Sequence, residues 1–563
     1  MDSETIQRRR WGTLGVLMIC LLVVVLDNTI LNVALRTIQQ DLSASQSSMQ
    51  WAVDSYALVF AGLLITWGIL GDRVGRKKVL VFGMLAFGAT SALCSFAHSS
   101  DQLILFRALM GIGAAAVQPQ TLSIIQNVFE PAERGKAIGI WAAGAGSAIA
   151  IGPLAGGALL KYFWWGSVFL VNVPIVIIGT VLILFLVPES KDPNPNRLDP
   201  QGVLLSMVAL VLLVYGIISG GNSNQWLTLQ ALGAIIAGVV LLALFVFLES
   251  RSSHPAIDVS LFKNRQFTAG GAAIGLTFFA LMGATFFLAY FLQAVRGYTP
   301  LAAGVALIAV AAAQLIFAPL SARLSARFGA RTVVAVGMTV AGLSMMSYAL
   351  LTESSPQWVI EILMFGLGTG MGLTMAPSTN AIMSAVPREK AGAGSAVNNT
   401  VRQVAGALGV AVLGSLLAVV FRSNLGADTP STVAAQLDQP AAVVAKLPPG
   451  QQVGPLVKKD SSESIGGALE FAGSAQAALQ ARAAGTPNAV TDAQKQQARA
   501  AVTGFVQKSK DSFVSAMHVA TFVAGWVDLI GAVVAWLFLP GRARTKRAGD
   551  RPLGNHEAAV VAP

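Results

Sequence analysis

Long apolar stretches alternate with short polar breaks along most of the chain. Each stretch holds about 20 residues, the length that crosses a hydrocarbon core of ~30 Å as a helix. The pattern therefore predicts an all-α polytopic membrane protein. Fourteen membrane-spanning helices are expected, at residues 12–36, 50–70, 79–97, 102–126, 137–160, 167–187, 202–220, 228–248, 268–292, 300–320, 333–352, 358–382, 394–421 and 513–539.

The spans divide into a group of six, an inserted pair and a second group of six, with a long polar stretch before the last span. We expect the following segments: a cytoplasmic N-terminus (1–11), a six-helix bundle (12–187), the inserted pair with its cytoplasmic linkers (188–267), five helices of a C-terminal bundle (268–421), an extracellular loop (422–512), the last span (513–539) and a cytoplasmic tail (540–563).

The charged residues support one orientation in the membrane. Only 12% of the residues are charged, against about 25% in a soluble domain, which excludes a soluble globular protein. With the N-terminus in the cytoplasm, the inner segments hold 24 of the 38 Lys and Arg residues and the short outer loops hold three. The net charge of +11 therefore reflects topology and not nucleic-acid binding. We expect a multi-pass protein of the cell membrane with both termini in the cytoplasm.

The sequence contains no pattern for a metal or nucleotide site. The two cysteines, Cys20 and Cys94, each lie inside an apolar stretch, and the four histidines are scattered. A phosphate-binding glycine loop with its Lys and Ser or Thr is absent from the sequence, which gives no support to ATP-driven transport. We expect no cofactor and no metal, and the proton gradient as the source of energy.

The two halves repeat each other in their second connection. GDRVGRKK (71–78) joins the second and third spans of the first group, and SARLSARFGAR (321–331) joins the second and third spans of the other group. A basic inner loop is a weak signal alone, but the matching position in each half favours an internal repeat.

Several local motifs carry a family resemblance. They are LDNTILNVAL (26–35), GDRVGRKK (71–78), RALMGIGAA (107–115), AIGPLAGG (150–157) and FLVNVP (169–174). Together they resemble the major facilitator superfamily, specifically its fourteen-helix drug:proton antiporter branch. The resemblance implies two six-helix bundles of the major facilitator fold plus two inserted helices, and proton-coupled efflux of lipophilic drugs, antiseptics or dyes by alternating access.

The second span reads WAVDSYAL (51–58), and its Asp54 resembles the subgroup that exports quaternary ammonium and other lipophilic cations. Met110 stands where the fourth-span pattern often has Gln. Residues 301–320 and 395–420 contain no acid, whereas family members that handle dications tend to have carboxylates there, which argues against efficient handling of dications.

Asp27 is the first candidate for proton coupling, because it lies about 15 residues, or roughly 23 Å, into the first span. A carboxylate at this depth is costly when ionised and suggests a functional site. Burial disfavours its charged form and a nearby cation favours it, so we expect a switchable proton site, with a permanently paired structural acid as the alternative. Arg107 lies at a compatible depth and is expected to tune Asp27 without titrating, or else to form a static ion pair.

Asp54 is the second candidate, for both proton coupling and substrate binding. Trp51, Tyr56 and Phe60 share its helix, and a carboxylate beside aromatic faces suits a lipophilic cation. The alternative is an acid at the membrane interface. Further candidate cavity residues, each of which could instead face lipid or bridge helices, are Gln118, Trp141, Phe287, Tyr290, Asn399 and Gln403.

Two further acids lie in spans, Glu361 and Asp528. Glu361 is expected to be solvated near the outer face. Asp528 falls near mid-membrane, and the sequence does not decide between a functional and a packing role.

Small residues in the fifth span are expected to form an interface that opens and closes. The resemblance also implies that the loop after the second span stabilises the outward-open state, with Asp72 capping a helix or pairing with an Arg. The candidate conformational residues are Gly71, Asp72, Arg73, Gly75, Arg76, Gly152, Pro153, Gly156 and Gly157.

The polar stretch 422–512 is predicted to contain a two-helix hairpin, formed by residues 463–484 and 491–514 with GTPN between them, lying over the outer opening. The expected partners of the chain are lipophilic small molecules, protons and the lipid bilayer, with no nucleic acid, and the chain is expected to be monomeric. Export of an endogenous metabolite or lipid is the alternative function. A passive channel or a membrane enzyme has less support, because no convergent catalytic set is visible.

Overall fold

The computed structural model describes residues 3–191, 199–223, 225–252, 259–386, 391–426, 429–437, 465–485 and 492–541. Every regular element within these ranges is a helix. The elements are α1 (Ser3–Asp41), α2 (Gln46–Val74), α3 (Arg76–Ser95), α4 (Ser100–Val128), α5 (Pro131–Tyr162), α6 (Ser167–Leu170), α7 (Asn172–Leu186), α8 (Pro200–Ser223), α9 (Ala231–Arg251), η1 (Val259–Lys263), α10 (Arg265–Tyr290), η2 (Phe291–Val295), α11 (Pro300–Phe328), α12 (Ala330–Ser347), η3 (Tyr348–Leu350), α13 (Gln357–Ala385), α14 (Ala391–Leu425), α15 (Thr429–Leu437), α17 (Ile465–Gly485) and α18 (Asp492–Phe538).

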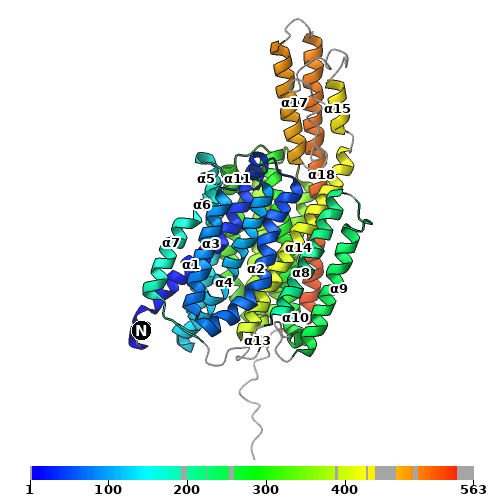
Figure 1. Ribbon diagram of the computed structural model, residues 1–563. Coiled ribbons are helices and arrows are strands. Elements are labelled where there is room, and N and C mark those ends of the chain that lie inside the picture. The colour runs from blue at the N-terminus through cyan, green and yellow to red at the C-terminus, as the bar shows by residue number, and fades with distance from the viewer. Residues whose placement is uncertain are drawn as a thin grey trace, which may run out of the picture.

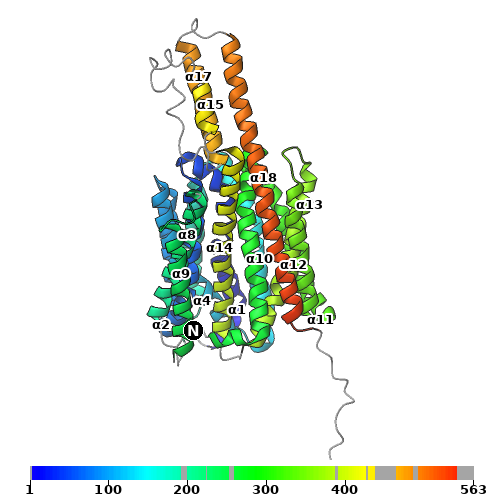
Figure 2. The same ribbon diagram turned by 90° about the vertical axis from the view of Figure 1, so that its right-hand side faces the viewer.

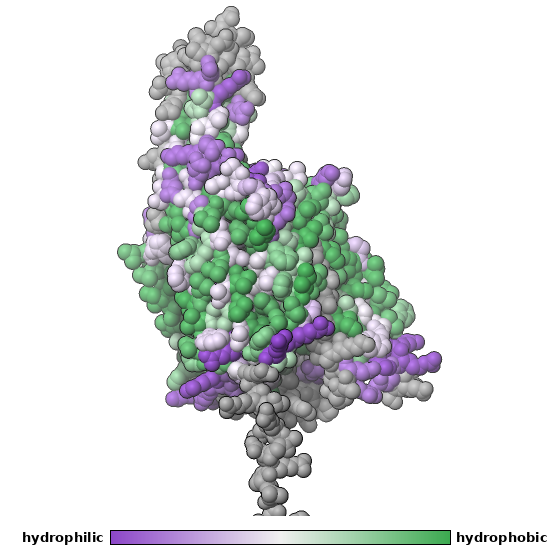
Figure 3. All heavy atoms as spheres, turned by 180° about the vertical axis from the view of Figure 1, so that it is seen from behind, coloured by the Kyte–Doolittle hydropathy of each residue, from purple (hydrophilic) through white to green (hydrophobic). Residues whose placement is uncertain are grey.

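The long helices have the length and composition of membrane spans. Twelve of the described helices pass this test, or thirteen when α2, which bends by 48° between Leu64 and Thr66, is taken as one span. Each of the fourteen expected stretches overlaps one of the described helices, and the 32-residue α5 covers the stretch at 137–160. On the face shown in Figure 3, apolar residues form a band across the bundle, with polar residues beyond it at both ends. The chain is therefore an all-helical, membrane-embedded protein, while the count of fourteen spans stays a prediction.

Two sets of helices pack in the same order. We call α1–α7 the first group and α10–α14 with α18 the second group. In the first group α2 packs on α4, α3 on α4, α1 on α5 and α7 on α1; in the second group α11 packs on α13, α12 on α13, α10 on α14 and α18 on α10. The groups meet along two lines, where α5 contacts α11 and where α2 contacts α14. The inserted helices α8 and α9 pack together, and α8 lies against both α2 and α14.

The two repeated loops bend in the same way. Gly75 connects α2 to α3 with φ +126°, and Gly329 connects α11 to α12 with φ +86°. Only glycine adopts such angles without strain. The repeat predicted from the two loop sequences therefore has a structural counterpart at these glycines.

The ends of the bundle differ. Figure 1 places the N-terminus of α1 at one end, where Figure 2 shows α18 finishing; we call this the terminal end. At the other end, called the hairpin end, α15, α17 and the first part of α18 (492–512) project away from the bundle as a hairpin extension (Figures 1 and 2). The rings of Phe471 and Phe505 pack edge to face inside it, 5.3 Å apart.

Three features of this extension differ from the sequence-based expectation. The second expected hairpin helix and the last span are one continuous helix of 47 residues, α18. Helix α15 is an additional element. The extension also stands along the direction of the spans instead of lying across the bundle (Figure 2). Residues 438–464 and 486–491 of the expected loop, and 542–563 of the expected tail, lie outside the described residues.

Candidate functional site

A buried ion pair joins α1 to α4. Nη1 of Arg107 donates a hydrogen bond to Oδ2 of Asp27 at 2.5 Å, and the side chains are 0% and 1% exposed, respectively. Both charges lie inside spans, where a lone charge is expensive and a pair is tolerated. The structure therefore joins the two candidates that the sequence placed at matching depth.

Asp27 has a second partner that the sequence analysis missed. Nδ2 of Asn172, at the start of α7, donates to Oδ1 of Asp27 at 3.1 Å and also contacts the Ser91 hydroxyl of α3 at 3.1 Å. The Ser91 hydroxyl in turn donates to the Phe169 carbonyl at 2.8 Å. The carboxylate of Asp27 is thus held by α4 and α7, and α3 orients the Asn172 amide. The FLVNVP motif was the available signal for Asn172.

Arg107 is held on its other side by α2. Its Nε donates to the Ala52 carbonyl at 3.1 Å, and its guanidinium lies 4.3 Å from the centroid of the Tyr56 ring. Tyr56 also accepts a hydrogen bond from Asn28 at 3.3 Å and stacks on Phe60, with ring centroids 5.7 Å apart. When the pair with Asp27 opens, Arg107 therefore still has a carbonyl and an aromatic face to contact.

Asp54 occupies a different face of α2. Trp51 packs near Tyr215 of α8, with ring centroids 6.3 Å apart, and Leu58 packs among apolar residues of α8 and α14. Positions 51, 54 and 58 share one helix face, whereas 52, 56 and 60 face α4. The expected single group of Asp54 with three aromatics is therefore divided: Trp51 shares the face of Asp54, while Tyr56 and Phe60 lie with Arg107.

The Asp54 carboxylate is fully buried, and neither of its oxygens has a hydrogen-bond partner among the described residues. Gln50, one turn earlier, is also buried and unpaired within the described part of the chain. A buried polar side chain normally has a partner. This pair of unpartnered groups lies at the line where α2 of the first group meets α14 of the second.

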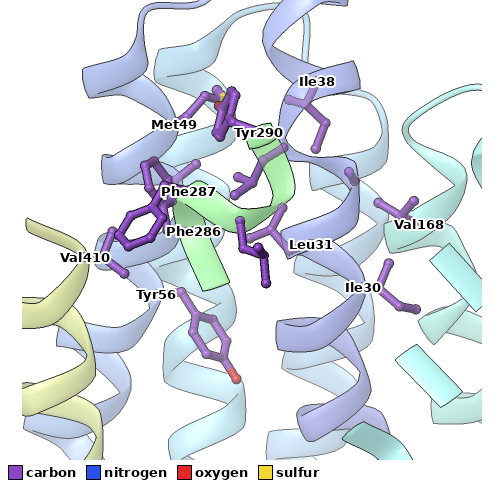
Figure 4. Close-up of a cluster of buried hydrophobic side chains, with 14 of the residues drawn as sticks. Ile30, Leu31, Ile38, Met49, Tyr56, Val168, Phe286, Phe287, Tyr290 and Val410 are labelled. Atoms are coloured by element: carbon purple, nitrogen blue, oxygen red, sulfur yellow. The ribbon is translucent and has the colours of Figure 1, made fainter. Parts of the chain in front are cut away.

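Phe287 and Tyr290 lie in an apolar cluster between the groups. Figure 4 shows Tyr290 beside Met49 of α2, and Phe287 beside Phe286, which lies next to Val410 of α14. Phe287 and Tyr290 are each 1% exposed. In this conformation they fill space between the groups toward the hairpin end. The other cavity candidates, Gln118, Trp141, Asn399 and Gln403, are half-buried. Buried polar atoms of Gln118 and Trp141 have no hydrogen-bond partner among the described residues.

The fifth-span glycines lie where helices approach most closely. A methyl group added to Gly152 would lie 1.9 Å from Thr29 Oγ1 of α1, and one added to Gly156 would lie 3.3 Å from Ile30 of α1. At Gly157 it would lie 2.5 Å from the Leu301 Cα of α11.

The carbonyl of Pro153 approaches Gly304 of α11 in the same manner, since a methyl group added there would lie 2.2 Å from that oxygen. The motif therefore forms the contact between α5 and both α1 and α11, near the hairpin end.

Arg36 of α1 and Gln293 make a further contact between the groups, besides α5–α11 and α2–α14. Nη1 of Arg36 on α1 donates to the Gln293 carbonyl, and Nε2 of Gln293 donates to the Val33 carbonyl at 2.9 Å. Gln293 lies in η2, the π-helical turn at the end of α10. Such turns are frequent at functional sites. Sequence reasoning missed both residues, since an Arg at the end of a span is typical of the membrane interface.

The loop after α2 is held within the first group. Asp72 accepts from Arg76 at 2.8 Å, and the backbone N–H of Arg76 donates to the Ser190 carbonyl at 2.9 Å. Arg73 is exposed at the end of α2. In this conformation Asp72 therefore pairs within its own motif.

Side chains from other parts of the first group pack directly against two glycines of this loop. A methyl group at Gly71 would lie 2.1 Å from Gln120 Oε1 of α4, and one at Gly75 would lie 2.7 Å from Glu189 Oε1.

Of the remaining acids, Glu361 is half-buried and accepts a hydrogen bond from Gln357 at 2.7 Å. No group of three or more His, Cys, Asp or Glu that could hold a metal occurs among the described residues.

The chain is similar to several transporters of drugs and antibiotics. It is 37% identical over 447 residues to the multidrug efflux pump LfrA of Mycolicibacterium smegmatis, covering 78% of this chain and 88% of that protein. It is 36% identical over 420 residues to the methyl viologen resistance protein SmvA of Salmonella typhimurium, covering 74% and 84%. The tetracenomycin C resistance and export protein of Streptomyces glaucescens is 32% identical over 537 residues, covering 95% and 92%.

Solved transporters share the fold. The chain superposes with a TM-score of 0.57 at 17% identity on a bacterial homologue of the human lysosomal transporter Spinster, covering 95% of this chain and 99% of that one. A peptide transporter, POT, gives a TM-score of 0.56 at 19% identity, covering 74% and 92%. Residues 17–410 match the family model of the Major Facilitator Superfamily. With its two similarly packed helix groups and these relatives, the chain belongs to the Major Facilitator Superfamily, whose members are transporters and not enzymes.

Proposed function

We propose that this transporter exports lipophilic, cationic compounds in exchange for protons by alternating access. The observation that carries the proposal is the buried pair of Asp27 and Arg107, at 2.5 Å and almost without solvent exposure. Ionisable residues deep in a membrane protein are rare because they are expensive to bury, and they usually mark a functional site. Its occurrence in a chain similar to multidrug efflux pumps points to coupling of drug export to ion movement.

Asp27 holds the transported proton in one state and pairs with Arg107 in the other. When Arg107 contacts Asp27, its guanidinium group neutralises the carboxylate in place of the proton. When the helices shift, Arg107 keeps its contacts with the Ala52 carbonyl and the Tyr56 ring, and Asp27 binds a proton instead. Two states are needed, and each ligand must bind one of them better.

The α2–α14 line is the proposed site for the substrate. Asp54 supplies an unpaired carboxylate there, and Trp51 supplies an aromatic face. A lipophilic cation gains charge attraction, cation–π contact and apolar burial from such a site. Asn399 and Gln403 of α14 are proposed to add uncharged hydrogen bonds. Export of an endogenous metabolite or lipid is the competing function, in which Asp54 has no direct role.

The proposed arrangement in the cell follows the charge distribution. We assign fourteen spans to the chain in a six, two and six arrangement, both termini to the cytoplasm and the hairpin extension to the outside of the plasma membrane. The groups would then be closed on the outer side in this conformation, because the α5–α11 and Arg36–Gln293 contacts lie near the hairpin end. A monomer without a cofactor, driven by the proton gradient, completes the proposal.

The decisive experiment uses the purified full chain in proteoliposomes with a pH-sensitive probe inside. Adding a lipophilic cationic dye is expected to move protons in the direction opposite to the dye in wild type. Asp27→Asn is expected to abolish this coupled movement. Asp101→Asn, the same chemical change at an exposed position on α4, is the matched control and is expected to behave as wild type. Dye transport without proton movement in wild type would refute antiport.

A second experiment tests the substrate class. Cells that lack other efflux systems and express Asp54→Asn are expected to lose resistance to monovalent lipophilic cations and to retain resistance to an uncharged drug. Unchanged resistance to the cations would remove Asp54 from the substrate site and favour the competing function.

A further inference from the structure

The second group contains a buried carboxylate that the proposed mechanism does not use. Asp528 on α18 is 0% exposed, and neither of its oxygens has a hydrogen-bond partner among the described residues. It lies ten residues, about 15 Å, before the end of α18, which places it well inside the membrane. A carboxylate in this position is far more stable with a proton than as an ion.

Close helix packing surrounds Asp528. A methyl group on Gly342 of α12 would lie 3.3 Å from the Asp528 Cβ, and one on Gly525 of α18 would lie 2.6 Å from the Gly342 carbonyl. On the other side, the side chain of Thr277 of α10 lies beside the carboxyl group, without the geometry of a hydrogen bond. Asp528 is therefore enclosed by α10 and α12.

Two of the basic groups on the neighbouring helices, Arg265 and Arg331, are too far along their helices to neutralise it. Arg265 begins α10, twelve residues before Thr277, and Arg331 lies eleven residues before Gly342, so each is displaced by about 17 Å along its helix. Arg402 of α14 places its guanidinium 4.6 Å from the Phe278 ring and forms no salt bridge among the described residues.

Tyr290 of α10 and Tyr348 of η3 are buried near the hairpin end and carry no positive charge. His518 of α18 lies ten residues, about 15 Å, before Asp528, and its ring contacts the Leu351 carbonyl. Arg422 of α14 and Lys508, Lys510 and Asp511 of α18 lie still further toward the hairpin end.

Asp528 lies at the helix junction of its group that corresponds to the junction around Asn172 in the first group. There, the sixth span contributes Asn172, which contacts Asp27 on the first span and Ser91 on the third. In the second group, the sixth span contributes Asp528, which lies between Thr277 on the first span and Gly342 on the third. The helices pack in the same order in both groups, so Asp528 lies at the matching helix junction. It is one turn along from the counterpart of Asn172, because Gly342 matches Gly88 in the repeat and a methyl group at Gly88 would meet Val176.

We propose that Asp528 is a second proton-binding site, formed where α18 of the second group packs between α10 and α12. This inference rests on the proposed antiport and extends it from one proton to two. The step is a simple protonation: the carboxylate takes up one proton to become the neutral acid, and it releases that proton to water when α18 separates from α12. The tight contact between Gly342 and Gly525 is the part of the packing that must loosen.

The second proton has a measurable electrical consequence. Exchange of one monovalent cation for one proton moves no net charge, whereas exchange for two protons moves one positive charge per cycle. Dye transport into proteoliposomes should therefore respond to an imposed membrane potential in wild type. In Asp528→Asn, which copies the shape of the protonated acid, one proton is lost from the cycle and exchange should become insensitive to the potential.

The experiment measures coupled proton and dye fluxes at imposed potentials in wild type, Asp528→Asn and the control Glu361→Gln. Two protons per monovalent dye in wild type and the control, and one in Asp528→Asn, support the proposal. The same ratio in wild type and Asp528→Asn overturns it while leaving the antiport at Asp27 standing. No proton movement in wild type overturns both.

A chemical measurement on wild type keeps the proposal testable if Asp528→Asn does not fold. Dicyclohexylcarbodiimide reacts with protonated carboxyl groups in apolar surroundings, and peptide mass spectrometry locates the adduct. Labelling of Asp528 that decreases when the cationic dye is bound supports a proton exchanged in the cycle. Complete absence of labelling between acidic and alkaline pH, or labelling that the dye does not change, overturns it.

Discussion

Removing Arg107 should destabilise the protein strongly and in a way that depends on pH. In Arg107→Met, Asp27 keeps only the Asn172 amide as a partner and is left as a buried charge without a cation. Breaking a buried ion pair from one side typically costs about 3–5 kcal/mol. The lost contact with the Tyr56 ring, at 4.3 Å, adds about 1 kcal/mol, and Met fills most of the remaining volume. We expect a loss of about 4–6 kcal/mol in the free energy of unfolding.

The double variant Asp27→Asn/Arg107→Met separates charge from packing. It removes both charges, so its loss should be only about 1–2 kcal/mol, smaller than that of Arg107→Met alone. Acidic pH should also restore part of the stability of Arg107→Met, because a proton on Asp27 removes the unpaired charge. The double variant has no charge at either position and should show no such recovery.

Unfolding by SDS titration in mixed micelles, followed by tryptophan fluorescence at pH 5 and pH 8, measures both effects. The reasoning is refuted if the single variant is as stable as the double variant, or if its loss is the same at both pH values. Either result would mean that the 2.5 Å pair contributes little beyond packing.

Three further outcomes follow from the same structure. Gly75→Ala places a side chain at φ +126° and should cost about 1–3 kcal/mol in the SDS titration, whereas Gly12→Ala, which meets nothing within 4 Å, should not destabilise the protein. Gly157→Val should prevent close approach of α5 and α11, and a cysteine introduced at the hairpin end should then react faster with a water-soluble maleimide; an unchanged rate would contradict this role. Asp72→Asn removes a pair with Arg76 that is partly exposed, so stability should fall by less than about 1 kcal/mol while dye efflux falls markedly; full efflux would show that Asp72 is not needed in the cycle.

The helices and one ion pair were predictable because strong physical constraints determine them. The bilayer requires apolar stretches of a fixed length, so the positions of the described helices follow from hydropathy. The pair of Asp27 and Arg107 was predictable because charges in spans are rare and the two lie at matching depth.

The other parts of the site carry no such signal. Asn172 and Ser91 are short polar residues that commonly join helices, and only their contacts reveal their link to Asp27. Helix periodicity already separates Asp54 from Tyr56, because residues two apart lie on different faces. Which neighbour each face meets depends on the rotation of α2 against α4 and α14, which a sequence does not specify. The continuity of α18 was visible in part, because no proline interrupts residues 492–538.

That continuity makes α18 a lever. Its 47 residues measure about 70 Å, so roughly 40 Å of stiff helix stands beyond a ~30 Å hydrocarbon core. A tilt of the span by about 10° about the membrane surface would carry the far tip sideways by about 7 Å, against about 5 Å at the inner end of the span. Paired spin labels at that tip would therefore follow the transport cycle in real time, and a binding protein that fixes the tip would stop the carrier without touching its drug site.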